Sequence, residues 1–157
     1  MNMKEICHKY IDAFGNYISD SFYDDEGGDY VELDIFNPVN EYMSIEIEID
    51  SSYFGFVCHN YDEIYYYDEN AEENLNKSIE KINGIISGKL CEISLNAYGQ
   101  PLSTAETAEV NAINKEYLDK IISSCGMTKC SGQIKICYWN SSPQIYSFEN
   151  GIVNLNS

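Results

Sequence analysis

Two segments near the start of the chain alternate strictly between aliphatic and polar residues. They span residues 31–35 and 43–50, and every second side chain is Val, Leu, Ile or Met. Strict alternation of this kind predicts β-strands with one dry face and one wet face. Apart from Ser44, the polar members are all acidic: Glu32, Asp34, Glu46, Glu48 and Asp50.

Two further strands are expected directly after this pair. Residues 53–59 place Phe54, Phe56 and Cys58 on one side of a strand, and residues 63–67 form the next one. The segments 37–40 and 60–62 contain the Asn, Pro and Asp residues that favour turns. Short connections between successive strands predict an antiparallel meander.

Helical spacing occurs in three places. Apolar residues recur at helical intervals over residues 3–18, over 70–88 and from about 103 to 124. The second helix follows a capping-box-like Asn70-x-x-Glu73, and we expect Gly88 to end it in a left-handed conformation. The third is expected to start at a capping box formed by Ser103 and Glu106.

The remaining periodic segments are short and strand-like. Residues 90–95 predict one strand, closed by a turn at 99–101, and residues 134–139 and 145–148 predict a final hairpin. The fold class is therefore predicted as α+β. We expect residues 1–157 to form a single domain, with an antiparallel meander sheet, an N-terminal helix and one or two further helices packed on one face.

The charge of the chain is concentrated in its first half. Residues 1–75 hold 19 carboxylates against two lysines, a net charge of −17, whereas residues 76–157 hold seven of each sign. Such a surface repels nucleic-acid phosphates and anionic membranes, so direct binding to either is not expected. The first residues have no signal-peptide pattern and no apolar run is long enough to span a bilayer, so we expect a cytoplasmic protein.

Sites for chemistry are sparse in this sequence. Neither a nucleophile elbow, a P-loop nor a dinucleotide-binding motif occurs, and we predict no catalytic residue, no metal and no cofactor. His59 adjoins Cys58 in a strand, so the two side chains point to opposite faces. The acidic loop 24–29 lacks the EF-hand pattern. All six cysteines are expected to be reduced thiols, mostly in the core.

One collective feature remains, namely the acidic outer face of the predicted sheet. Like charges opposite one another across strands are destabilising, and a cationic partner would relieve that repulsion. Tyrosines of the run 65–67 would add contact area for a partner. Alternatively, these tyrosines could simply cover the sheet surface, and the carboxylates could serve solubility alone. The candidate partner-binding residues are Glu32, Asp34, Glu46, Glu48, Asp50, Asp62, Glu63, Tyr65 and Tyr67.

The central part of the chain resembles immunity proteins of bacterial polymorphic toxin and contact-dependent growth inhibition systems. The matching features are the aromatic strand 53–59 with its His59, then Asp68, then the helix end 82–89 and the pair Tyr138-Trp139. The resemblance covers about a third of the chain. It implies a small cytoplasmic inhibitor that binds one cognate toxin domain, often a nuclease.

Three functional hypotheses follow. The first is a non-enzymatic acidic inhibitor that neutralises a basic toxin domain. The second is a small enzyme or metal-dependent module that uses Asp or Glu side chains together with His59. The third is a nucleic-acid-mimicking inhibitor of DNA-binding proteins. The sequence leaves the oligomeric state and the identity of the toxin open.

Overall fold

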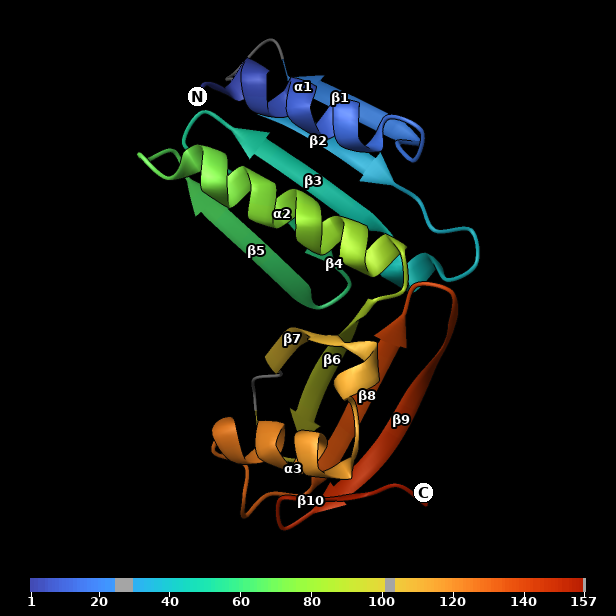
Figure 1. Ribbon diagram of the computed structural model, residues 1–157. Coiled ribbons are helices and arrows are strands. Elements are labelled where there is room, and N and C mark those ends of the chain that lie inside the picture. Colours follow the sequence, from blue (N-terminus) through green and yellow to red (C-terminus); the bar gives the residue numbers. More distant parts are fainter. Residues whose placement is uncertain (25–29, 101–103, 157) are drawn as a thin grey trace. The chain divides into compact units, whose positions relative to one another are not determined.

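The strands of the protein form two separate antiparallel sheets, each with helices on one side. The computed structural model describes residues 1–24, 30–100 and 104–156 (Figure 1). The chain divides into two compact units, Met1–Gly84 and Ile85–Ser157. Within the described residues no helix has the length and apolar character needed to cross a membrane.

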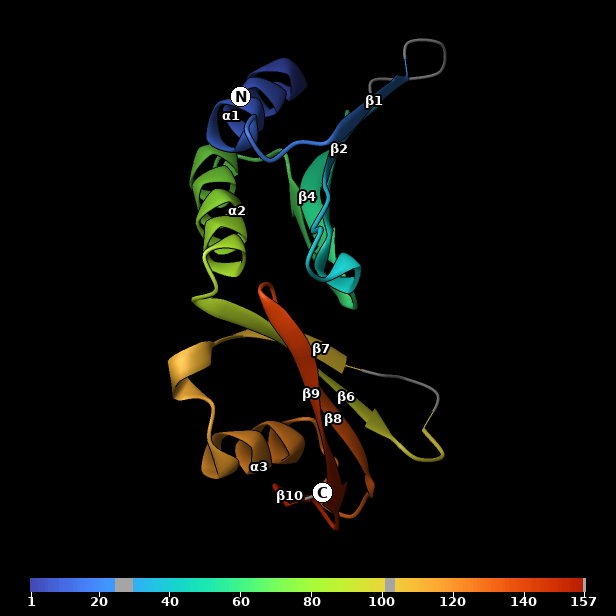
Figure 2. The ribbon, with the colours of Figure 1, turned by 90° about the vertical axis from the view of Figure 1, so that its right-hand side faces the viewer.

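The first unit is a five-stranded sheet in the order β1-β2-β3-β4-β5, so each strand pairs with its neighbour in sequence. Its elements are α1 (Met3–Phe14), β1 (Asp20–Asp24), β2 (Tyr30–Ile35), a 3-10 turn (Glu41–Met43), β3 (Ile45–Asp50), β4 (Tyr53–Cys58), β5 (Tyr61–Tyr66) and α2 (Ala71–Ile86). Figure 2 shows both helices on the same side of this sheet, which leaves its other side uncovered within the unit.

The alternating strands of the first unit bury their aliphatic side beneath the helices. In β2 and β3 every apolar residue is almost fully buried, and from α1 the rings of Tyr10 and Phe14 complete the core. The hydroxyl groups of Tyr10 and Ser78 share a buried hydrogen bond of 2.7 Å that links α1 to α2. Burying each aliphatic side chain contributes about 1.5–3 kcal/mol, so this core decides which face of the sheet turns inward.

Gly55 in β4 is required by the close approach of β5. A Cβ atom at this position would lie 2.1 Å from the backbone oxygen of Glu63, which is far inside contact distance. Any other residue would push the two strands apart. Gly55 therefore keeps β5 in the sheet, and β5 carries several of the candidate site residues.

The second unit is built on the sheet β10-β9-β8-β6-β7. Its elements are β6 (Leu90–Ala97), β7 (Thr104–Glu109), a 3-10 turn (Val110–Ala112), α3 (Lys115–Ser124), β8 (Gly132–Tyr138), β9 (Ser141–Glu149) and β10 (Ile152–Asn154). From α3, Leu118, Ile121 and Ile122 pack against the buried side of the sheet. A carboxylate oxygen of Asp119 accepts a 2.8 Å hydrogen bond from the backbone N–H of Val153, which holds β10 against α3.

The predicted α+β class is confirmed, with antiparallel sheets and an N-terminal helix. The strands divide between two sheets rather than continuing one meander. All six cysteines lie in the described part of the chain, where none forms a disulfide and four are buried, as expected for reduced core thiols. The second predicted helix is also confirmed, and Gly88 after it adopts φ +73°.

Two predicted helices differ from the observed elements. The first helix ends at Phe14 instead of residue 18, and the chain then forms the edge strand β1. Strand β1 has almost no buried side chains, so the sequence shows no alternating apolar pattern there. Residues 104–109 form β7, so the helix predicted from residue 103 begins only at Lys115. The Asn114 side chain caps that helix by accepting from the N–H of Tyr117. The proposed cap Ser103 and Pro101 of the predicted turn lie outside the described residues, as do residues 25–29 of the acidic loop.

Candidate functional site: the outer face of the first sheet

The outer face of the first sheet, opposite α1 and α2, is lined by carboxylates on its first three strands. Strand register places Glu32 directly across from Glu48, and Asp34 directly across from Glu46. On its other side Asp34 lies across from Asp20 of β1. The five strands contain neither lysine nor arginine. We call Asp20, Glu32, Asp34, Glu46 and Glu48 the acidic face.

The carboxylates of the acidic face are close enough to perturb one another. Ligand oxygens of Glu32, Asp34 and Glu46 all lie within 4.8 Å of one another. Partial burial, together with the charge of Glu32, raises the pKa of Glu46 to about 7. Burial and the same neighbouring charge also raise the pKa of Asp34. The fold therefore holds these carboxylates close together although their negative charges repel one another.

Tyrosine hydroxyl groups offset part of this repulsion. The hydroxyl of Tyr30 donates to Glu32 over 2.9 Å, and that of Tyr53 donates to Glu48 over 3.4 Å. Burial and the neighbouring carboxylates raise the pKa of Tyr30, so the phenol stays a neutral donor. No comparable contact from these tyrosines reaches Asp34 or Glu46 among the hydrogen bonds of the described residues.

Apolar side chains lie beside the acidic face on both edges of the sheet. Phe22 of β1, directly across from Glu32, is 57% exposed. On β5, Ile64 and Tyr66 point outward and Tyr66 is 68% exposed. Large exposed aromatic residues next to charged groups are typical of protein-binding surfaces.

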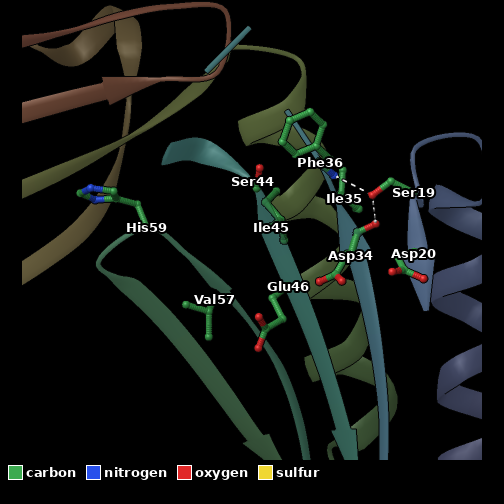
Figure 3. Close-up of a pocket in the computed structure, with 10 residues that line it drawn as sticks. All are labelled: Ser19, Asp20, Asp34, Ile35, Phe36, Ser44, Ile45, Glu46, Val57 and His59. Atoms are coloured by element: carbon green, nitrogen blue, oxygen red, sulfur yellow. Dashed lines mark hydrogen bonds between the residues drawn. The ribbon is translucent and has the colours of Figure 1, made fainter. Parts of the chain in front are cut away.

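A pocket of about 450 Å³ opens at one end of the acidic face (Figure 3). The lining residues come from β1, β2, β3, β4 and the loops next to them: Ser19, Asp20, Asp34, Ile35, Phe36, Ser44, Ile45, Glu46, Val57 and His59. The Ser19 hydroxyl fixes one wall, because it donates to the backbone oxygen of Asp34 and accepts from the N–H of Phe36. At the other end His59 has φ 55° in the turn after β4.

Glu63 does not lie on the outer face, contrary to the prediction. Register pairs it with Phe56, whose side chain is in the core beneath the helices. Lys81 of α2 forms a 2.5 Å ion pair with Glu63, and the hydroxyls of Tyr61 and Tyr65 donate to the same carboxylate. Burial raises the pKa of Glu63, but these three donors outweigh it, and the net pKa lies below its usual value.

Tyr65 and Tyr67 also lie on the helix-facing side of the sheet. Both rings contact Phe54, with centroids 5.6 and 5.7 Å away. They are therefore part of the structural core rather than of an exposed patch. The side chain that projects from the outer face is Tyr66, between them. Alternation showed that residues 63, 65 and 67 share a face, but it could not show which face.

The other predicted site residues stay at the surface. Asp62 is exposed on the outer face across from Val57. Asp50 closes β3, where the backbone and side chain of Ser52 hydrogen-bond to its carboxylate and lower its pKa. The sequence reasoning missed Asp20 and Phe22, because nothing in their pattern revealed β1.

Chemically, this arrangement suits the binding of positive charge. A divalent cation could be held by Glu32, Asp34 and Glu46, whose oxygens are of the type that calcium and magnesium take. A cationic side chain of another protein could be held in the same field.

A search of protein-family models, of curated proteins and of solved structures finds no match to the chain.

Proposed function

We propose that the protein is a non-enzymatic acidic inhibitor of the immunity type, which binds a basic toxin domain through the outer face of its first sheet. One observation carries the proposal, namely two pairs of carboxylates directly opposed across β2 and β3 with no cation on any of the five strands. The resemblance to toxin-immunity proteins adds the class of partner.

The energetic argument concerns the cost of the opposed pairs. Each pair of like charges across a strand costs ~0.2–1 kcal/mol in a fold whose net stability is about 5–15 kcal/mol. Solubility requires net charge, but it does not require that the charges face one another on one side of a sheet. Binding of a cationic surface would turn this repulsion into attraction and would speed the encounter.

The distribution of charge between the two units agrees with this role. Residues 1–84 hold 20 carboxylates and four lysines, a net charge of −16, and residues 85–157 hold six and five, a net charge of −1. A basic partner is therefore attracted to the first unit. Phe22, Ile64 and Tyr66 then supply apolar contacts on either side of the carboxylates. Aromatic anchors and charge together give both affinity and specificity.

The test begins with affinity capture of the partner from the native organism. Binding of the purified partner is then measured by surface kinetics at two ionic strengths, for the wild type and for a variant with Glu32, Asp34, Glu46 and Glu48 changed to Gln. We expect association about tenfold slower and with little salt dependence for this variant. A matched control changes four exposed carboxylates elsewhere to Gln and should leave the association rate nearly unchanged: Glu41, Glu80, Glu109 and Glu149.

The immunity role has its own readout. Expression of the captured partner in a bacterial host should arrest growth, and co-expression of the wild-type protein should restore it. The four-Gln variant should protect less well than the matched control. Equal association rates for the two variants would refute binding through the acidic face, and a partner that is harmless to the host would refute the immunity role.

A further inference from the structure

We propose that the pocket beside β2, β3 and β4 receives a single arginine side chain of the basic partner. This inference rests on the proposed function and identifies the anchor within it. The pocket volume of about 450 Å³ lies within the range of sites that enclose a small organic group. All of its lining residues belong to the first unit.

The walls of the pocket have two chemical characters. Val57 and Phe36 supply apolar surface, whereas Asp20, Asp34 and Glu46 supply carboxylates from three adjacent strands (Figure 3). An occupant must therefore combine an apolar stem with a cationic head. Lysine and arginine are the side chains with this construction, because their methylene stems lie along apolar surface while the charge reaches polar groups.

The number of carboxylates favours arginine over lysine. Asp34 stands between Asp20 on one strand and Glu46 on the other, so acceptor oxygens face the pocket from several directions. A guanidinium group has five N–H donors in a planar fork and can bond to more than one carboxylate at once. An ammonium group is a more strongly hydrated point charge and loses more on leaving water.

The electrostatic state of the carboxylates in the pocket supports a cationic occupant. Burial raises the pKa of Asp34 and, together with nearby carboxylates, that of Glu46 to about 7. A bound guanidinium would stabilise the charged carboxylates and return these values toward their usual range. Neutral and anionic occupants would leave the repulsion in place. Binding should thus lower the titration midpoint of Glu46.

The probe for this inference is N-acetyl-arginine-N-methylamide, titrated into the full chain at pH 7.5 and followed by amide and side-chain NMR. We expect shifts confined to the pocket residues, with a lower titration midpoint for Glu46. The citrulline analogue has the same shape without the charge and should give no shifts at the same concentrations. The lysine analogue should bind at least threefold more weakly.

Two variants distinguish binding in the pocket from general attraction to the negative charge of the acidic face. Val57→Phe places a bulkier side chain in the wall of the pocket and keeps every charge, so probe affinity should fall at least tenfold. Ile152→Phe makes a similar change at an exposed position of the second unit, outside the pocket, and should leave affinity unchanged. Thermal melts of both variants confirm folding. Absence of shifts, equal shifts from the citrulline analogue, or unchanged affinity of Val57→Phe would overturn the inference. Shifts from calcium chloride that exclude the probe would also overturn it, by assigning the pocket to a metal ion.

The same variants distinguish this inference from the proposed function. If the four-Gln variant loses association with the captured partner while Val57→Phe binds it as well as wild type, the acidic face binds the partner and the pocket inference fails. If the arginine probe occupies the pocket but neither variant alters partner binding, the pocket is an arginine site and the proposed function fails.

Discussion

Replacing Glu46 by Gln should stabilise the protein at neutral and alkaline pH. Glu46 lies across from Asp34 and within 4.8 Å of both Asp34 and Glu32 at their carboxylate oxygens. Gln keeps the shape of the side chain and removes its charge. The substitution therefore tests whether the acidic face stores repulsion, without disturbing the packing of β3.

The sign of the effect follows from proton linkage. The pKa of Glu46 rises from an ordinary value of 4.5 to about 7 in the folded protein, because burial and neighbouring carboxylates disfavour its charged form. Between these two values the folded state holds a proton that the unfolded state has released. Stability is therefore lost as the pH rises from about 4.5 to 7, and the full penalty is present above pH 7.

The magnitude is set by the exposure of the group. One pKa unit corresponds to about 1.4 kcal/mol, but Glu46 is only partly buried and solvent screens its interactions. After this screening we expect a penalty of about 1–2 kcal/mol above pH 7. The Glu46→Gln variant should recover that amount at pH 8 and almost none at pH 4.5.

Urea denaturation at pH 4.5, 6 and 8 measures the free energy of unfolding for the wild type and the variant. The control is Glu80→Gln, an exposed position on α2 that changes the net charge equally. A gain of the same size in Glu80→Gln would mean that only total charge matters. A gain in Glu46→Gln that does not vary with pH would refute the assignment of the raised pKa to this carboxylate.

Two further predictions concern the same unit. Raising sodium chloride from 10 to about 150 mM should raise the melting temperature, because the Debye length falls from about 30 to 8 Å and the added ions screen repulsion within residues 1–84. A flat or falling melting temperature would contradict this prediction. Changing Lys81 to Met should cost about 1–2 kcal/mol at pH 7, since it removes the cation paired with Glu63. The pKa of Glu63 is lowered in the folded protein, so this cost should shrink as the pH falls below about 4, as urea melts at pH 7 and 3 would show.

The sequence by itself determined the helices and strands in which buried and exposed residues recur at a regular spacing. Residues 31–35 and 43–50 alternate because one side of each strand is in water, and the observed strands β2 and β3 bury their aliphatic members. The helix of residues 71–86 was equally clear, because its apolar residues recur at helical spacing. The carboxylates that β2 and β3 contribute to the acidic face could be predicted for this reason, because the residues that alternate with buried aliphatic ones must point outward.

Only the tertiary structure decided which side of β5 turns inward and where the edge strands lie. From the sequence Glu63 is expected at the surface. In the structure it lies on the helix-facing side of the sheet, where Lys81, 18 positions later in the chain, forms an ion pair with it. Strand β1 is almost entirely exposed, so no burial pattern marked it, and its Asp20 joins the acidic face only through pairing with β2. Long-range pairing and countercharge are set by the three-dimensional packing, and the local sequence pattern contains neither.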